Sequence, residues 1–271
     1  MFHKDWSISR SRVRLLRALN PGVPVHGLYG GEPDQYAEAV DAVGPVLDSL
    51  CGCQLGTGRW RWQHTDLVVR DWFQRVGRGL PFDVLHVMQW DLLLFDSLER
   101  LYEFVPPDAV ALTGITPLDR IADGWHWTRT EPHRTETADL LAGAQREHGF
   151  RGVPKACLGP GAAFPRSFLD RYAATAIPEI GHDEVRLPLF AELFGYALVD
   201  TGFYPRWYDA ESERLFNANG TELPVAEVRE ELLNPAGRRA FHPCRESFTE
   251  TVLTGLVSVC TRASRSDGPS V

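Results

Sequence analysis

A single carboxylate follows a strongly apolar segment, where it could hold a cation. Residues 81–95 have the sequence PFDVLHVMQWDLLLF, in which Asp91 follows the strand-like residues 84–88. The pattern predicts a central strand of an α/β sheet, and ligands of open sheets gather beyond the carboxyl ends of the strands. An unpaired carboxylate would cost several kcal/mol in that environment. We therefore expect Asp91 to face a metal ion, an Arg or Lys side chain, or a set of N–H donors.

A second set of acidic residues precedes an apolar segment. His182, Asp183 and Glu184 stand directly before residues 185–194. Acids in the first turn of a helix complement its dipole, and the residues alone favour this structural interpretation. The functional alternative is that one of these side chains transfers a proton during a reaction.

Two further segments could contact a ligand. The run GPGAAFPRSFL at residues 159–169 contains Gly159 and Gly161, whose small size lets a backbone approach a ligand closely. The run RWRW at residues 59–62 alternates Arg and Trp, which could stack on a nucleobase or on a sugar face. Such a pattern is more often an edge strand, or the start of a helix, whose tryptophans fill the core.

Positioning these residues requires a scaffold, and the sequence periodicity predicts alternating helices and strands. Helices are predicted at residues 9–19, 34–50, 65–76, 97–102 and 138–149, and strands at residues 23–29, 84–88, 110–114 and 154–158. Most arginines of the first helix are assigned to a solvated face. Tyr29 ends the first strand and is a candidate nucleotide contact. Residues 51–58 are a predicted loop, and residues 128–137 a mobile lid.

The alternation predicts the fold class. We expect an α/β fold with a mixed, mostly parallel central sheet that helices cover on both faces. The chain of 271 residues, with 44% hydrophobic content, can bury one large core. A single domain is therefore expected over residues 1–260, followed by a disordered tail at residues 261–271.

Composition excludes several classes of protein. The net charge of -8 argues against a nucleic-acid binder, whose binding surface is normally basic. No run is long enough to cross a bilayer and the first residues do not resemble a signal peptide, so a cytoplasmic protein is expected. Five cysteines, an odd number, suit reduced thiols, and Cys51 and Cys53 lack the second pair that a zinc site needs.

The order of these motifs resembles that of the nucleotide-sugar-dependent glycosyltransferases with the GT-A fold. In that family a strand ends in an Asp-x-Asp motif, a glycine-rich segment leads into a helix, and an acidic pair precedes a later helix and strand. The corresponding residues here are Gln89–Trp90–Asp91, residues 159–169, Asp183–Glu184 and residues 195–198. The resemblance covers residues 23–204 and implies a GT-A-like domain, a nucleoside-diphosphate-sugar donor, a hydroxyl acceptor and a divalent metal, Mn²⁺ or Mg²⁺.

The resemblance also implies roles for single residues. Asp91 would contact the metal and His242, in the segment Phe-His-Pro, would be a further ligand, although a packing or surface role suits His242 equally. Gln89 replaces the first acid of the motif and offers only a neutral carbonyl oxygen. The family resemblance makes Asp183 the base that takes the acceptor's proton in an inverting reaction, with Glu184 as second choice and His182 as the fallback.

Two alternatives remain open at this point. A sugar nucleotidyltransferase would need a glycine-rich phosphate loop with an Arg, which residues 27–32 lack. A sugar-nucleotide-binding protein without catalytic activity would be consistent with Gln89. Specificity would depend on residues 120–137 and 205–219, whose aromatic side chains suit stacking on a sugar but would equally suit packing or a homodimer interface.

Overall fold

The structure, a computed structural model, describes residues 1–218, 220–247 and 255. The tail predicted at residues 261–271 lies outside them. The chain forms two compact units, which are described separately: unit 1 contains Met1–Gly52, Met88–Phe104 and the chain from Phe203 onward, and unit 2 contains Cys53–Val87 and Val105–Gly202. The single domain expected over residues 1–260 stays a prediction. Among the described residues, no helix combines the length and apolarity needed to span a bilayer.

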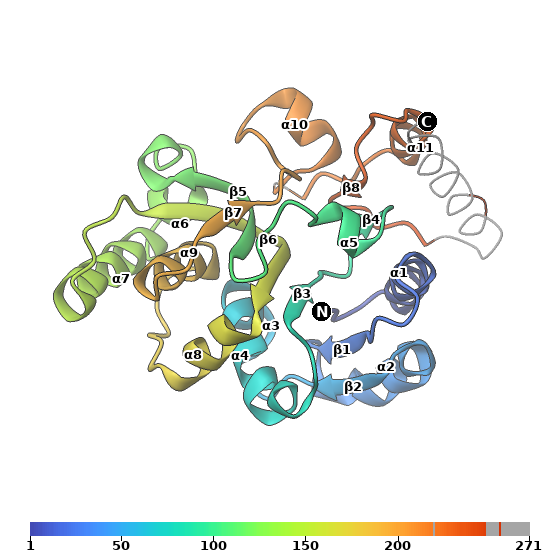
Figure 1. Cartoon of the computed structure of the whole chain (residues 1–271), viewed down its shortest axis with the longest axis horizontal. Coiled ribbons are helices and arrows are strands. Elements are labelled where there is room, and N and C mark those ends of the chain that lie inside the picture. Colours follow the sequence, from blue (N-terminus) through green and yellow to red (C-terminus); the bar gives the residue numbers. More distant parts are fainter. Residues whose placement is uncertain (219, 248–254, 256–271) are drawn as a thin grey trace, which may run out of the picture. The chain divides into compact units, whose positions relative to one another are not determined.

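Unit 1 contains two small sheets and several helices (Figure 1). Its elements are α1 (Trp6–Leu19), β1 (His26–Tyr29), η1 (Pro33–Gln35), α2 (Tyr36–Val43), η2 (Gly44–Val46), β2 (Ser49–Gly52), β4 (Leu93–Leu94), α5 (Leu98–Leu101), α10 (Ala210–Leu215), α11 (Val225–Leu233) and β8 (Ala240–Phe241). Strands β1 and β2 pair in parallel, and β4 and β8 pair antiparallel.

The first part of unit 1 differs from the prediction in one element. Helix α2 ends at Val43, and Ser49–Gly52 form strand β2 where the end of a helix and the start of a loop were expected. Gly44 and Pro45 explain the difference, because glycine and proline both disfavour continuation of a helix. Phe2 adds a single-residue parallel bridge to Tyr29.

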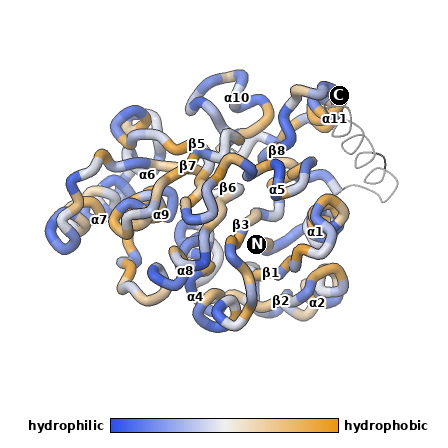
Figure 2. The backbone as a smooth tube through the Cα atoms, in the orientation of Figure 1, coloured by the Kyte–Doolittle hydropathy of each residue, from blue (hydrophilic) through white to orange (hydrophobic). Residues whose placement is uncertain are grey.

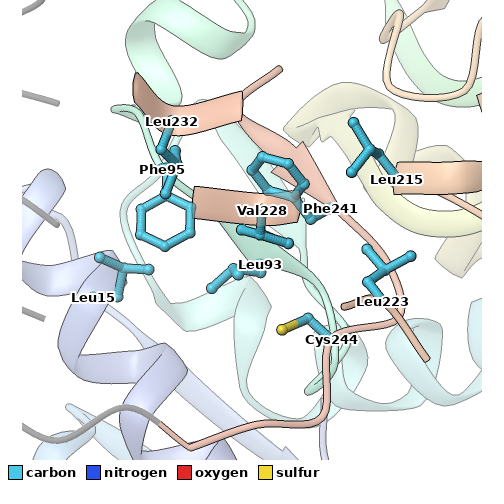
Figure 3. Packing of buried hydrophobic residues seen from close by; sticks show 9 residues of the cluster. All are labelled: Leu15, Leu93, Phe95, Leu215, Leu223, Val228, Leu232, Phe241 and Cys244. Carbon is cyan, nitrogen blue, oxygen red and sulfur yellow. The ribbon is translucent and has the colours of Figure 1, made fainter. Parts of the chain in front are cut away.

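A hydrophobic cluster holds the later segments of unit 1 against α1 (Figure 3). Its buried residues are Leu15, Leu93, Phe95, Leu215, Leu223, Val228, Leu232, Phe241 and Cys244. Helix α1 presents alternating polar and apolar residues, as its amphipathic sequence predicts (Figure 2). Most of its arginines were expected on a solvated face; Arg12 is an exception, since it is buried and its Nη2 donates to the carbonyl oxygens of Cys244 and Glu246 at 2.8 and 2.9 Å.

Unit 2 is built around one four-stranded sheet. Its elements are α3 (Gly58–Gln63), α4 (Thr65–Arg75), η3 (Gly77–Gly79), β3 (Val84–Val87), β5 (Val110–Pro117), η4 (Leu118–Arg120), α6 (His126–Arg129), α7 (His133–His148), β6 (Lys155–Pro165), α8 (Arg166–Ala174), α9 (Asp183–Leu193) and β7 (Leu198–Asp200). The strand order is β3-β6-β5-β7. Helices α8 and α9 pack against β6, and α4 packs against α8.

The strand directions in this sheet correct part of the prediction. The sheet is mixed, as expected, but it is not mostly parallel, because β6 runs antiparallel to both β3 and β5 and only β5 and β7 are parallel. Strand β3 also lies at an edge of this sheet rather than in its centre. An apolar strand has the same composition in either direction, so its sequence pattern carries no information about the direction in which it runs.

The glycine-rich segment is part of a strand that leads into helix α8. Strand β6 continues through Gly159 and Gly161 to Pro165. Its register against β5 shifts between the pairs Ala111–Ala163 and Thr113–Leu158, which marks a bulge or a similar irregularity of the ladder. Gly161 has a φ of 85°, a value that favours glycine. The absence of a Cβ atom is therefore explained by the backbone conformation at this position.

The lid predicted at residues 128–137 is also corrected. Helix α6 ends at Arg129 and α7 begins at His133, so most of this segment is helical. The polar composition was misleading, because α7 buries only a few of its residues, among them Thr137, Leu140 and Ala144, and therefore lacks a strong apolar period.

A half-buried histidine in β3, His86, leads to a prediction about acid stability. Burial lowers the pKa of His86 to about 4, below the usual value of about 6.5. Between these values the unfolded chain binds a proton that the folded chain does not, so the free energy of unfolding falls as the pH falls. Between about pH 7.5 and 5, the free energy of unfolding of His86→Gln should therefore fall by about 2 kcal/mol less than that of the wild type.

The measurement is urea unfolding of both proteins across that pH range. His148→Gln, at an exposed position of α7, is the control for the replacement of a histidine as such. The prediction would be contradicted if the free energy of unfolding had the same pH dependence in the wild type and in His86→Gln.

Candidate functional site

In unit 1, the pairing of β4 with β8 positions Asp91. Leu93 lies opposite Phe241, and beyond this pair the N–H of Cys244 donates to the carbonyl oxygen of Asp91 at 2.8 Å. Two segments that are far apart in the sequence therefore run side by side. Their alignment brings His242, which directly follows β8, next to the Asp91 side chain.

Asp91 is only 6% exposed and has two basic neighbours. Its Oδ1 lies 3.5 Å from Nε2 of His242, and its Oδ2 lies 3.6 Å from Nε of Arg245. Burial raises the pKa of Asp91, but the contact with His242 and the positive charge of Arg245 outweigh burial and leave the pKa below its usual value. The expectation that a positive group faces Asp91 is therefore confirmed.

His242 is held in a defined orientation. Its Nδ1 lies 2.8 Å from the carbonyl oxygen of Asn217, its backbone N–H donates to Leu215, and its ring packs on Phe216. A carbonyl oxygen can only accept, so Nδ1 carries the hydrogen and Nε2, which faces Asp91, either has a lone pair or holds a second proton. A metal-binding histidine commonly donates its other ring N–H to a carbonyl in this way.

The donor atoms around Asp91 suit a divalent cation only in part. One carboxylate and one imidazole nitrogen face each other at a distance that one ion could bridge, since bonds to such ions are about 2.0 to 2.6 Å long. Among the residues that the structure describes, no group of three His, Cys, Asp or Glu side chains could hold a metal. Arg245 also lies close to Oδ2 of Asp91, so this oxygen is less available to a cation. A cation here would need further oxygens from a ligand, as Mg²⁺ often does when it is bound together with phosphates.

Two of the other nucleotide-contact candidates of unit 1, Tyr29 and Trp90, are in its core. Tyr29 is 2% exposed, donates its hydroxyl hydrogen to the carbonyl oxygen of Glu32 and packs with Phe2 and Trp90 in one cluster. Trp90 is 9% exposed. Gln89 is half-buried and its backbone carbonyl accepts from the N–H of Leu92. Tyr29 and Trp90 therefore serve packing in this structure.

In unit 2, the acidic pair begins a helix. His182 is the N-cap of α9, and Asp183 and Glu184 lie in its first turn, which confirms the structural interpretation of their sequence position. Asp183 is 2% exposed; its Oδ2 accepts from the N–H of Thr65 at the start of α4, and its Oδ1 lies 2.8 Å from Nδ1 of His182. Asp183 therefore joins the starts of two helices.

Glu184 is the more accessible of the two acids. Its side chain is 13% exposed against 3% for Asp183. One oxygen accepts from the N–H of Gly159 at 2.9 Å and the other lies 3.6 Å from Nδ1 of His182. The structure therefore brings together Glu184, Asp183 and Gly159 in unit 2, as it brings together Asp91 and His242 in unit 1. Gly161 lies farther along β6, at the irregularity of the ladder.

A buried arginine fixes the backbone just before these acids. Arg186 has a fully buried side chain, and all of its N–H donors have acceptors: both oxygens of Asp66 at 2.6 and 2.7 Å, Nδ1 of His64 at 2.9 Å, and the carbonyls of Ile180 and Gly181. Tyr172 donates to the same Asp66 carboxylate. Burial lowers the pKa of Arg186, but Asp66 more than compensates and raises it. Sequence reasoning missed this pair, because α4 and α9 each carry several charged residues and nothing in the sequence marks Asp66 and Arg186 as the buried ones.

The Arg-Trp run is a helix, and its tryptophans do not fill the core. It forms α3, where Trp60 is half-buried and donates its indole N–H to Glu179 at 2.7 Å, while Trp62 is 55% exposed. Trp62 contacts the rings of Trp127 and His182, with centroids 5.3 and 5.8 Å away. Trp127 stacks on His182 at 4.1 Å. Burial disfavours a charge on His182, but the carboxylates of Asp183 and Glu184 prevail and raise its pKa.

Comparison with known proteins gives no assignment. No protein-family model matches this chain, and no curated protein matches its sequence.

Proposed function

We propose that this chain is a nucleotide-sugar-dependent glycosyltransferase with a GT-A-like fold. The strongest support is the pairing of Asp91 with His242, which are 151 positions apart (242 minus 91) and lie with side-chain atoms 3.5 Å from each other. The resemblance to GT-A enzymes pairs these same two residues at one metal. Nothing in the periodicity or composition of the sequence would otherwise connect them.

Asp91 and His242 are assigned to the diphosphate of the donor. Both would be ligands of a divalent cation, with the remaining positions left to donor oxygens. When bound, the cation neutralises the charge that develops on the leaving nucleoside diphosphate. Arg245 is placed to add a second positive charge, since its guanidinium lies 3.6 Å from Asp91 and its side chain is 39% exposed. Asn217 holds the His242 ring through its backbone carbonyl.

Glu184 is assigned as the base, ahead of Asp183. Both oxygens of Asp183 already have close neighbours in Thr65 and His182, and its side chain is almost completely covered. Glu184 keeps part of its carboxylate accessible, while the N–H of Gly159 fixes one oxygen. A base must come within hydrogen-bond distance of the hydroxyl that it deprotonates. Direct attack of that hydroxyl on the anomeric carbon implies inversion of configuration.

The experiment that tests this function is an assay of product release. The full chain is incubated with candidate nucleotide sugars, with and without Mn²⁺, and the release of nucleoside diphosphate is measured. Release that depends on the cation supports the proposal. Pyrophosphate formation would instead identify a nucleotidyltransferase. Binding without any turnover would identify a sugar-nucleotide-binding protein, the alternative that Gln89 favours.

Binding of the nucleotide alone should stabilise the protein. A ligand present at about one hundred times its dissociation constant, and bound only by the folded chain, adds about 2.7 kcal/mol to the free energy of unfolding. A thermal-shift panel of UDP, GDP, dTDP and CDP with Mg²⁺ or Mn²⁺ should therefore show one base that stabilises most. A melting temperature that no nucleotide of the panel changes would contradict donor binding.

A further inference from the structure

We infer that Trp62 is the stacking platform for a sugar ring of the acceptor. This inference rests on the proposed function, because it names the substrate class that Glu184 would deprotonate. It goes beyond that function in assigning a carbohydrate acceptor and the side chain that binds it.

The first argument is the exposure of Trp62. All tryptophans of the chain lie within the described residues, and Trp62 is the only one among the large hydrophobic side chains that are exposed, at 55%. An exposed indole offers a large apolar face with a polar N–H at its edge, which is why tryptophan is enriched at binding interfaces. Trp60, two positions earlier, is by contrast engaged with Glu179 and with the ring of His64.

The second argument is that the exposed ring is held in place. The ring of Trp62 packs against that of Trp127, which is 6% exposed. Trp127 is itself packed against three histidine rings, those of His126, His133 and His182. The ring of Trp62 also meets His182 edge to face, at an interplanar angle of 81°. A ring fixed by such packing loses little conformational entropy when a ligand covers it.

The third argument is the chemistry next to the ring. His182, which contacts Trp62, has its Nδ1 3.6 Å from the Glu184 carboxylate, and Glu179 binds the neighbouring Trp60. Carboxylates accept hydrogen bonds from hydroxyl groups and repel phosphate. Glu184 thus lies beside a residue that contacts Trp62, and Glu179 lies beside the neighbouring Trp60. An aromatic face in such surroundings suits a neutral sugar, whose C–H face would cover the indole, better than it suits a phosphate-bearing nucleotide.

The test uses the full chain on a printed glycan array, with and without each of the four nucleoside diphosphates. The wild type should bind a defined set of glycans, and Trp62→Ala should lower the affinity for them about 10- to 100-fold, as loss of a central aromatic anchor does. Trp62→Phe, which keeps a ring, should retain part of the affinity. Phe104→Ala is the matched control, since Phe104 is an exposed aromatic residue of unit 1, and it should bind as the wild type does.

Other outcomes separate this inference from the proposed function. Absence of glycan binding by the wild type, or equal binding by the wild type and Trp62→Ala, would overturn the platform. Nucleoside diphosphates should raise the melting temperature of the wild type and of Trp62→Ala by the same amount. Loss of this shift in the variant would also overturn the platform, because Trp62 would then bind the donor. Trp62-dependent glycan binding without any nucleotide shift would support the platform and contradict the glycosyltransferase.

Discussion

Arg186→Met is expected to lower the free energy of unfolding by about 3 to 5 kcal/mol, the usual loss when one partner of a buried ion pair is removed. Methionine fills a similar volume but donates no hydrogen bond, so the Asp66 carboxylate would remain buried without its cation. Asp66 and Arg186 both have completely buried side chains, and solvent cannot replace the lost contacts. The carbonyl oxygens of Ile180 and Gly181 would lose their donors as well.

The measurement is urea unfolding at pH 7, compared with that of Arg134→Met. Arg134 pairs with Glu131 on the surface, where both side chains are at least half exposed, and such pairs contribute about 0 to 1 kcal/mol. Asp66→Asn should be nearly as destabilising as Arg186→Met. A loss below about 1 kcal/mol for Arg186→Met would show that the site tolerates an unpaired buried carboxylate, contrary to the argument from burial.

Asp91→Asn is expected to reduce turnover by about 10²- to 10³-fold while leaving the fold intact, the effect of removing one electrostatic contact in a transition state. Asparagine has nearly the shape of aspartate, and the carbonyl oxygen that accepts from Cys244 belongs to the backbone, so the pairing of β4 with β8 is preserved. The charge that faces His242 and Arg245 is lost. The measurement is the rate of nucleoside-diphosphate release at saturating donor and Mn²⁺.

Asp96→Asn is the matched control for this variant. Asp96 is a nearby acid whose carboxylate accepts from the N–H of Ser97 and lies 3.6 Å from Arg100, so it has a structural role at the start of α5. Its replacement should leave turnover close to that of the wild type. Wild-type turnover in Asp91→Asn would remove Asp91 from the proposed mechanism, and a large drop in its melting temperature would make the loss of activity structural.

Local sequence signals predicted much of the fold, and they failed where long-range pairing decides the structure. Helix α4 and strand β5 lie where apolar periodicity and flanking turn residues place them. The direction of β6 and its position between β3 and β5 depend on pairing partners far away in the sequence, about which the residues of β6 carry little information. Strand β2 was missed because the helical spacing of apolar residues continues through Leu47 and Leu50, past Gly44 and Pro45, where the helix ends.

The candidate site shows the same limit. Asp91 could be identified from its place after an apolar strand, and the family resemblance added His242. Arg245, which completes the surroundings of Asp91, follows β8 in a segment without regular periodicity. The exposure of Trp62 could not be predicted, because a tryptophan on a short helix is buried or exposed according to what packs against that helix.

The pairing of β4 with β8 also has a consequence during synthesis of the chain. Leu93 can meet Phe241, and Asp91 can meet Cys244, only after the ribosome has translated residues 241–244. Unit 2 ends at Gly202 and has all of its strands by then, so it can fold while translation continues. A nascent chain that stops before Ala240 would leave Asp91 without His242 and Arg245. Ribosome-bound chains of increasing length should therefore acquire the structure of unit 2 first, and the surroundings of Asp91 last.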